Sequence, residues 1–175
     1  MESSASVGHR DDDDAALACL IDEIVDIHAA IASLEAELAT RMAATQQIAY
    51  ERTARQPLHS QMRELEERSI AAEIGLATRV NDRAVQNRMH DALELIRNYP
   101  AAHSALADGR ISSRHAAVIV ETGRALQDPD ARALYEATVL ERTLRDTARR
   151  GRGRSPNRSW KSCITGRSRN GTGRR

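Results

Sequence analysis

Four polar side chains near the middle of this 175-residue chain are its best candidates for molecular recognition: Arg79, Arg83, Gln86 and Asn87. Arginine pairs well with guanine in the DNA major groove, and asparagine and glutamine pair with adenine. On a helix, the last three of these residues would share one outward face, and Arg79 would precede that helix, within reach of a phosphate. DNA is therefore a candidate partner.

Residues 73–89 have the pattern of a helix-turn-helix. A first helix is expected to end near Ala77, a polar turn follows, and Val85 and Met89 would anchor a second helix. An ordinary helical hairpin with a solvated polar face is the alternative. Charge favours that alternative, because residues 1–147 hold 16 arginines against 25 acidic residues, a net charge of −9 that opposes contact with phosphates.

The other reactive side chains show no spacing typical of a catalytic or metal site. The histidines His28, His59, His90, His103 and His115 include no pair four residues apart on one helix, as zinc-binding pairs are. The serines lack a nucleophile elbow, and the carboxylates are scattered as helix-face charges. We therefore predict no enzymatic activity, no metal, no cofactor and no small-molecule ligand.

Residues 15–55 contain no glycine or proline and predict one long helix. Large apolar residues repeat on it in two seven-residue lattices, the second interrupted by Arg41. We name these eight residues the seam: Leu17, Leu20, Ile24, Ile27, Ile31, Leu34, Leu38 and Ile48. Such a stripe is typical of the a and d positions of a coiled coil. It predicts either a homodimer through residues 15–55 or packing on the chain's own later helices.

The remaining helical region predicts short hairpins and no strand. Pro57 ends the long helix, and Asn81 is a candidate N-cap for a helix that stops before Pro100. Pro100 opens a short helix that Gly109 can close in the left-handed conformation, and Ser112 caps the next. Asp128 and Pro129 open the last helix.

Each of these helices has an expected inward face. The composition has no phenylalanine, so we expect leucine, isoleucine, valine and alanine to supply the burial. The inward residues expected along the chain are Leu58, Met62, Leu65, Ala72 and Leu76, then Val85, Met89, Ala92 and Leu93, then Ala116, Ile119, Val120, Gly123 and Leu126, and finally Ala133, Ala137, Leu140 and Leu144.

Three stretches resemble one known family. Residues 105–116 read Ala-Leu-Ala-Asp-Gly-Arg-Ile-Ser-Ser-Arg-His-Ala, residues 73–80 read Glu-Ile-Gly-Leu-Ala-Thr-Arg-Val, and residues 91–95 read Asp-Ala-Leu-Glu-Leu. These are similar to the actinobacterial 13E12-repeat family, over about residues 15–147. The resemblance implies the helical domain of unknown function numbered 222, which usually precedes an HNH endonuclease domain. It implies no activity for the helical domain itself.

The nuclease motif of that family is missing from this chain. An HNH module needs a histidine base and further histidine or asparagine ligands for a divalent metal. No histidine follows His115, and Cys163 has no second cysteine near it. Residues 148–175 contain nine arginines and Lys161 with no acidic residue and no periodic apolar pattern. We interpret this segment as the product of a frameshift, with genuine low-complexity sequence as the alternative.

The sequence thus predicts an all-α protein with a long N-terminal helix, a bundle of short helical hairpins and a disordered basic C-terminal tail. Its expected parts are a disordered acidic N-terminus at 1–14, a helical domain at 15–147 and an Arg/Gly/Ser-rich tail at 148–175. We expect a truncated, non-catalytic protein that associates with DNA, and the alternative is a coiled-coil scaffold with no nucleic-acid role. No signal peptide or membrane-length apolar run is present, which favours the cytoplasm and no membrane partner.

Overall fold

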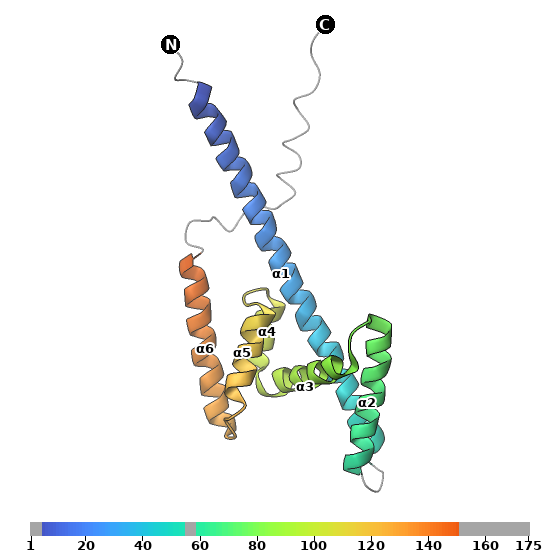
Figure 1. Ribbon diagram of the computed structural model, residues 1–175. Coiled ribbons are helices and arrows are strands. Elements are labelled where there is room, and N and C mark those ends of the chain that lie inside the picture. The colour runs from blue at the N-terminus through green and yellow to red at the C-terminus, as the bar shows by residue number, and fades with distance from the viewer. Residues whose placement is uncertain (1–4, 55–58, 151–175) are drawn as a thin grey trace.

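The computed structural model describes residues 5–54 and 59–150, and within them the chain forms six helices and no strand. The helices are α1 (Ala5–Thr53), α2 (His59–Thr78), α3 (Asp82–Asn98), α4 (Pro100–Ala107), α5 (Ser113–Gly123) and α6 (Pro129–Arg150). The predicted all-α class, with one long helix followed by shorter ones, is confirmed. Figure 1 shows α2 to α6 gathered around the C-terminal half of α1, while its N-terminal half projects as a rod. We name α2–α6 with the C-terminal half of α1 the body.

The first helix begins ten residues earlier than predicted. Residues 5–14 belong to α1 and do not form the separate disordered segment that the sequence indicated. The reason is that these residues include no proline, and adding residues to an existing helix costs far less than starting one. Pro57, predicted to end α1, lies outside the described residues, as do residues 151–175, whereas residues 148–150 continue α6.

The core of the body forms two clusters on one alanine-rich face of α1. Ala32 and Ala36 pack with residues of α3 to α6, and Met42 and Ala43 pack with α2 and α3. Small side chains let backbones approach closely, so α3 and α4 lie directly against α1. α3 runs across the body from α2 to the α4–α5 pair (Figure 1), and α6 packs on α4 and α5.

The largest fully buried side chain is an aromatic ring, Tyr99, although aliphatic residues were expected to supply the burial. Tyr99 lies at the junction of α3 and α4, where it faces Tyr135 edge-on with 6.5 Å between the ring centroids. The ring fits because Gly123 of α5 has no side chain, and a Cβ there would collide with the Tyr99 hydroxyl.

Two predicted inward faces are wrong. Met62, Leu65, Ala72 and Leu76 are exposed, and α2 instead packs through Ala71 with Ile70 and Ile74. In α6, Ala133 and Ala137 are exposed, whereas Leu140 is buried and Leu144 is partly buried as predicted. Both helices carry apolar residues around more than one side, so the neighbours decide which side is covered. The inward residues of α3 and α5 are buried or partly buried as predicted.

Candidate functional site

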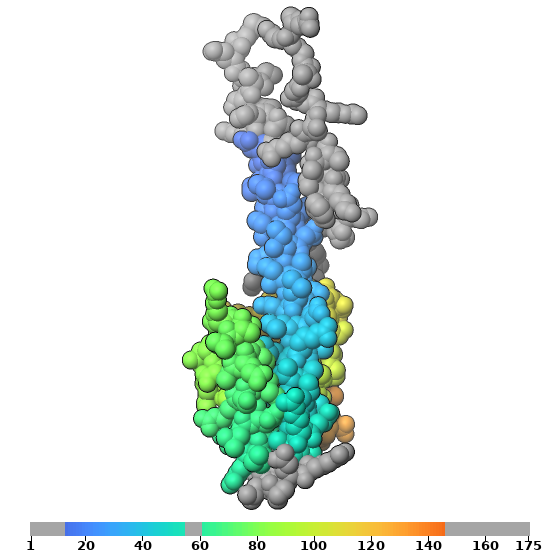
Figure 2. Space-filling view, turned by 90° about the vertical axis from the view of Figure 1, so that its right-hand side faces the viewer, coloured from blue at the N-terminus to red at the C-terminus, as the bar shows by residue number. Residues whose placement is uncertain are grey.

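The seam of α1 is open to solvent along its whole length. Its eight residues are between 44% and 65% exposed, from Leu38 and Ile48 at the lower limit to Leu34 at the upper. Between Asp13 and Ile31 no residue is buried. Figure 2 shows this part of α1 rising from the body as a single helix. The alternative that the seam packs on the chain's own helices therefore does not hold for the described residues.

The buried and exposed sides of α1 differ in the size of their side chains. The buried side is formed mainly by small residues, beginning at Ala32 and continuing through Ala36, Ala43 and Ala49 to Thr53. The exposed side presents branched leucine and isoleucine side chains, which have more apolar surface to bury. The body thus uses the side of α1 that allows close helix contact, and the side with the larger hydrophobic area has no partner among the described helices.

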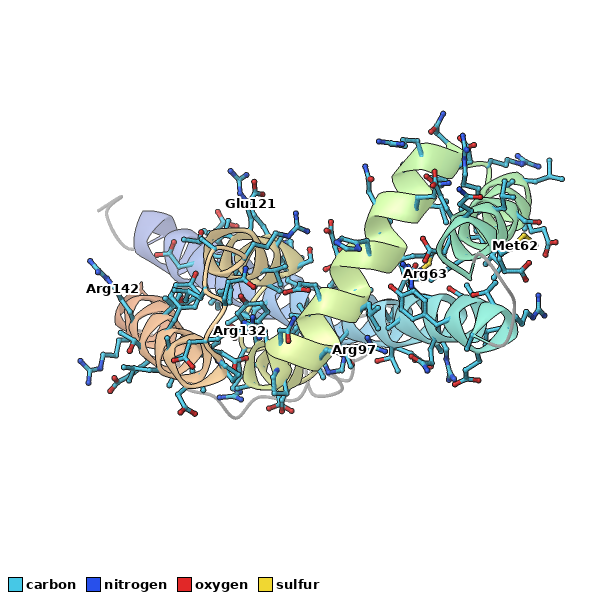
Figure 3. All side chains as sticks on the ribbon, turned by 90° about the horizontal axis from the view of Figure 1, so that it is seen from below. Met62, Arg63, Arg97, Glu121, Arg132 and Arg142 are labelled. Atoms are coloured by element: carbon cyan, nitrogen blue, oxygen red, sulfur yellow. The ribbon has the colours of Figure 1, made fainter. Side chains whose placement is uncertain are left out.

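A groove of about 420 Å³ lies beside the C-terminal end of the seam, between α1, α3 and α5. Leu38 belongs both to the seam and to the lining of this groove. The other apolar lining residues are Ala39, Met42, Ala92, Leu95, Leu106, Ala116, Ala117 and Val120. The charged rim consists of Glu35, Arg88, Asp91, Arg114, Glu121 and Arg124, of which Arg124 and Asp91 form an ion pair. Figure 3 shows Glu121 at the solvent side of α5.

The predicted DNA-reading residues lie at the junction of α2 and α3. α2 ends at Thr78, and Arg79 takes the left-handed conformation, with φ at +58°, while the Val80 amide donates to the Gly75 carbonyl at 2.9 Å. A Cβ on Gly75 would approach the Val80 carbonyl oxygen to 2.6 Å, so this glycine permits the tight turn. Asn81 then caps α3 as predicted, its side chain accepting from the Arg83 amide at 2.9 Å.

Three of the four predicted side chains are exposed at the junction of α2 and α3, but α2 and α3 together carry no excess of positive charge. Arg79, Arg83 and Asn87 are exposed and Gln86 is half-buried, while Val85 and Met89 hold the helix in the core. Residues 59–98, which form α2 and α3, contain six arginines and seven acidic residues. A surface of balanced charge supplies little of the phosphate attraction on which duplex binding depends. The DNA-reading role of these residues stays a prediction.

The stretch that carried the family resemblance, residues 105–116, forms the turn between α4 and α5. Gly109 has a φ of +69°, and the Arg110 and Gly109 amides donate to the carbonyls of Ala105 and Leu106 at 2.9 and 3.0 Å, which closes α4. Ser112 opens α5, and its amide donates to Nδ1 of His115 at 3.3 Å. Local capping therefore accounts for Gly109, Ser112 and His115 in this stretch.

The polar groups inside the body connect its helices by hydrogen bonds. Glu136 of α6 accepts from the Ala102 amide at 2.8 Å, at the start of α4. Arg132 donates to the Asn98 side chain at 3.0 Å and to the Leu126 carbonyl at 2.8 Å, and Figure 3 shows it among the helices. Burial raises the pKa of Tyr99 above its ordinary value of 10.0, and the positive charge of Arg132 offsets part of this rise. These groups join α6 to α3 and α4.

No group of three or more histidine, cysteine, aspartate or glutamate residues within 5–54 and 59–150 could hold a metal ion. Among the helices of that same part of the chain, none is long and apolar enough to cross a membrane. No family model, curated protein or solved structure matches this chain at a significant level.

Proposed function

We propose that this protein is a non-catalytic scaffold that self-associates through a coiled coil of its α1 helices. The observation that carries the proposal is the exposure of the seam: eight leucine and isoleucine side chains in heptad spacing, each at least 44% exposed on a single chain. The relation to the 13E12-repeat family, drawn from residues 105–116, stays part of this proposal.

Burial of the seam offers a large favourable free energy. Removing a leucine or isoleucine side chain from water contributes roughly 1.5–3 kcal/mol when the burial is complete. The seam residues are already about half covered by their own helix, so each has roughly half of that still to gain. Contiguous exposed apolar patches of this kind on soluble proteins mark interaction sites. Even after the entropy cost of association, eight such residues on each of two chains favour a stable complex.

A second copy of this chain is the best-matched partner. Heptad stripes pack into each other by inserting each a or d side chain between four residues of the facing helix, and two identical stripes satisfy this geometry together. The residues on the other sides of α1 agree with this arrangement, because Asp22, Asp26 and Glu37 lie outside the a and d positions. Arg41 is the one charged residue in the lattice between Leu17 and Ile48.

The test is replacement of Ile24 and Ile31 by aspartate, followed by sedimentation equilibrium of the full chain. We expect the wild type to dimerise at micromolar concentration and the double variant to be monomeric there, with a Kd weakened by at least about a hundredfold. The reason is that four aspartates would be buried without partners in the interface of the dimer. Helical content in circular dichroism should be unchanged, because both positions are exposed on the single chain.

Val25 provides the matched control. It is 52% exposed, as Ile24 is, but it lies one residue off the seam. Val25→Asp should leave the Kd within about twofold of wild type, whereas Ile24→Asp alone should weaken it strongly. A wild-type chain that sediments as a monomer at tens of micromolar would overturn the proposal.

Association with DNA is the second candidate function. It is favoured by the exposure of Arg83 and Asn87 one turn apart on α3, the second helix of a helix-turn-helix arrangement. The balanced charge of residues 59–98 and the net charge of −9 over residues 1–147 weigh against it. We therefore rank it below self-association.

A further inference from the structure

We propose that the two copies pair antiparallel, so that the N-terminal end of one α1 lies over the groove between α1, α3 and α5 of the other. This inference rests on the proposed self-association and adds to it a direction and a docking site. It is drawn from the distribution of charge along α1 and from the place where the seam meets the groove.

Charge is distributed asymmetrically along α1. Residues 11–27 contain seven acidic residues and no arginine or lysine, whereas residues 28–53 contain three acidic residues with Arg41 and Arg52. Parallel pairing would set one acidic half beside the other. Antiparallel pairing sets each acidic half beside the less acidic half of the second copy. Paired helices lie about 8–10 Å apart, within the distance over which charges still act at physiological salt, so the second arrangement is favoured.

The position of Arg41 also favours antiparallel pairing. Arg41 occupies a d position in the C-terminal part of the seam, and its side chain is 75% exposed. On its own helix it forms an ion pair with Glu37, at 3.1 Å. In a parallel pair, Arg41 would face Arg41 across the seam. In an antiparallel pair that sets Leu17 of one copy opposite Leu38 of the other, Arg41 lies opposite Asp13 and Asp14, both exposed, one turn before Leu17. The arginine that interrupts the apolar stripe then acquires carboxylate partners from the second copy.

The seam is continuous with the groove. Because Leu38 lines the groove, a helix that lies along the seam toward its C-terminal end must pass over the groove, with α3 and α5 beside it. The charges on the rim sum to zero. Arg124 pairs with Asp91, and the two positive charges of Arg88 and Arg114 equal the two negative charges of Glu35 and Glu121. The groove therefore contributes apolar contact through residues such as Ala117, and the direction is selected by Arg41 and the acidic half of α1.

Antiparallel pairing also produces a closed dimer with no binding surface left for a third copy. The two contacts between an N-terminal end and a groove are identical by two-fold symmetry, so each copy uses its seam and its groove once. The bodies then lie at opposite ends of the paired helices, where they do not compete for space. A dimer that ends growth in this way is the expected species.

Charge reversal distinguishes the two directions, using the full chain and Kd values from sedimentation equilibrium. In the antiparallel dimer Arg41→Glu alone, and Asp13→Arg with Asp14→Arg, each convert attraction into repulsion at two symmetric places, so each should weaken the Kd about tenfold. The chain with all three substitutions restores the attraction, and its Kd should return to within about threefold of wild type. In a parallel dimer each change replaces one like-charged pair by another and leaves the Kd unchanged.

The groove is tested by two bulky substitutions on α5. Ala117 is exposed and lines the groove, whereas Val118 is 57% exposed and lies outside it. Ala117→Trp should fill the groove and weaken the Kd about tenfold or more, while Val118→Trp should leave it unchanged. An unchanged Kd for Ala117→Trp would overturn the groove contact.

The failures of the two proposals are distinct. A dimeric wild type that responds to Ile24→Asp but not to the charge reversals overturns the antiparallel direction and leaves self-association standing. A monomeric wild type overturns both.

Discussion

The ring of Tyr99 is fully buried between α3, α5 and α6, but its hydroxyl makes no hydrogen bond of normal geometry with the described residues. A buried hydroxyl without a partner costs about 1–3 kcal/mol, because the hydrogen bond it makes to water in the unfolded chain is lost. The ring itself fills the space beside Gly123 and Tyr135. At this position the aromatic surface stabilises the body and the oxygen atom does not.

Tyr99→Phe should therefore leave the free energy of unfolding at pH 7 equal to that of wild type or raise it by up to about 1 kcal/mol. The pKa of Tyr99 is raised by burial, so the folded protein holds this proton more tightly than the unfolded chain. Ionisation of Tyr99 therefore leaves the free energy of unfolding unchanged below pH 10 and lowers it as the pH rises from 10 toward the folded pKa. Tyr99→Phe should then exceed wild type by a larger margin at pH 10.5 than at pH 7.

Urea denaturation of both proteins at the two pH values measures both effects, and the difference between the proteins isolates the effect of Tyr99. A loss of more than about 2 kcal/mol in Tyr99→Phe at pH 7 would mean that the hydroxyl does make a strong hydrogen bond.

The turn between α4 and α5 depends on Gly109 for two reasons. Its φ of +69° is disfavoured for residues with a Cβ, and a Cβ there would lie 2.8 Å from the Cβ of Ala29 on α1. This turn thus packs against α1 on the side away from the seam, and it also fixes Ile111, which is buried. One small residue allows the α4–α5 hairpin to approach the long helix.

Gly109→Ala should lower the free energy of unfolding by about 2 kcal/mol, because it adds a backbone penalty to a steric clash. Thermal or urea denaturation of the full chain checks this. The Kd of self-association should not change in the folded variant, since Ala29 does not belong to the seam. Ala107→Gly on α4 is a useful comparison, because that position is exposed and the change should cost only about 1 kcal/mol. Equal stability of Gly109→Ala and wild type would contradict the requirement for glycine.

At the scale of the whole molecule, charge is divided unevenly along the chain. Residues 151–175 contain seven arginines and Lys161 without an acidic residue, while the six helices carry an excess of acidic residues. A basic segment binds nucleic acid by releasing counterions, which is insensitive to sequence and weakens steeply with salt. Groove contacts by α3 would instead discriminate between sequences by about 1–3 kcal/mol for each good base contact.

Duplex DNA binding should therefore depend on the C-terminal segment. We expect the full chain to bind at low salt without sequence preference, and a chain ending at Arg150, where α6 ends, to lose this binding. Fluorescence anisotropy across a salt series measures both. Sequence-selective binding by the shortened chain that disappears in Arg83→Ala with Asn87→Ala, and persists in Arg68→Ala on α2, would establish α3 as a DNA-reading helix.

The ends of the later helices follow from local features of the chain. Asn81, Pro100, Gly109 and Ser112 each act on the hydrogen bonds or the backbone angles of their own neighbours, so their effect can be read without knowing the fold. It also determined the heptad spacing of the seam, which is a property of the chain alone. The start of α1 was misplaced because no local feature stops that helix before Ala5.

Which face of each amphipathic helix is covered depends on the packing of distant helices. α1 carries an alanine face and a leucine and isoleucine face, and the body packs on the alanine face because small residues let α3 and α4 approach closely. α2 likewise packs through Ala71 and leaves Leu65 exposed. Burial of Tyr99 required the gap at Gly123, 24 residues away. The covered face of a helix depends on contacts between distant segments. Hydrophobic periodicity describes one helix at a time and therefore does not predict these contacts.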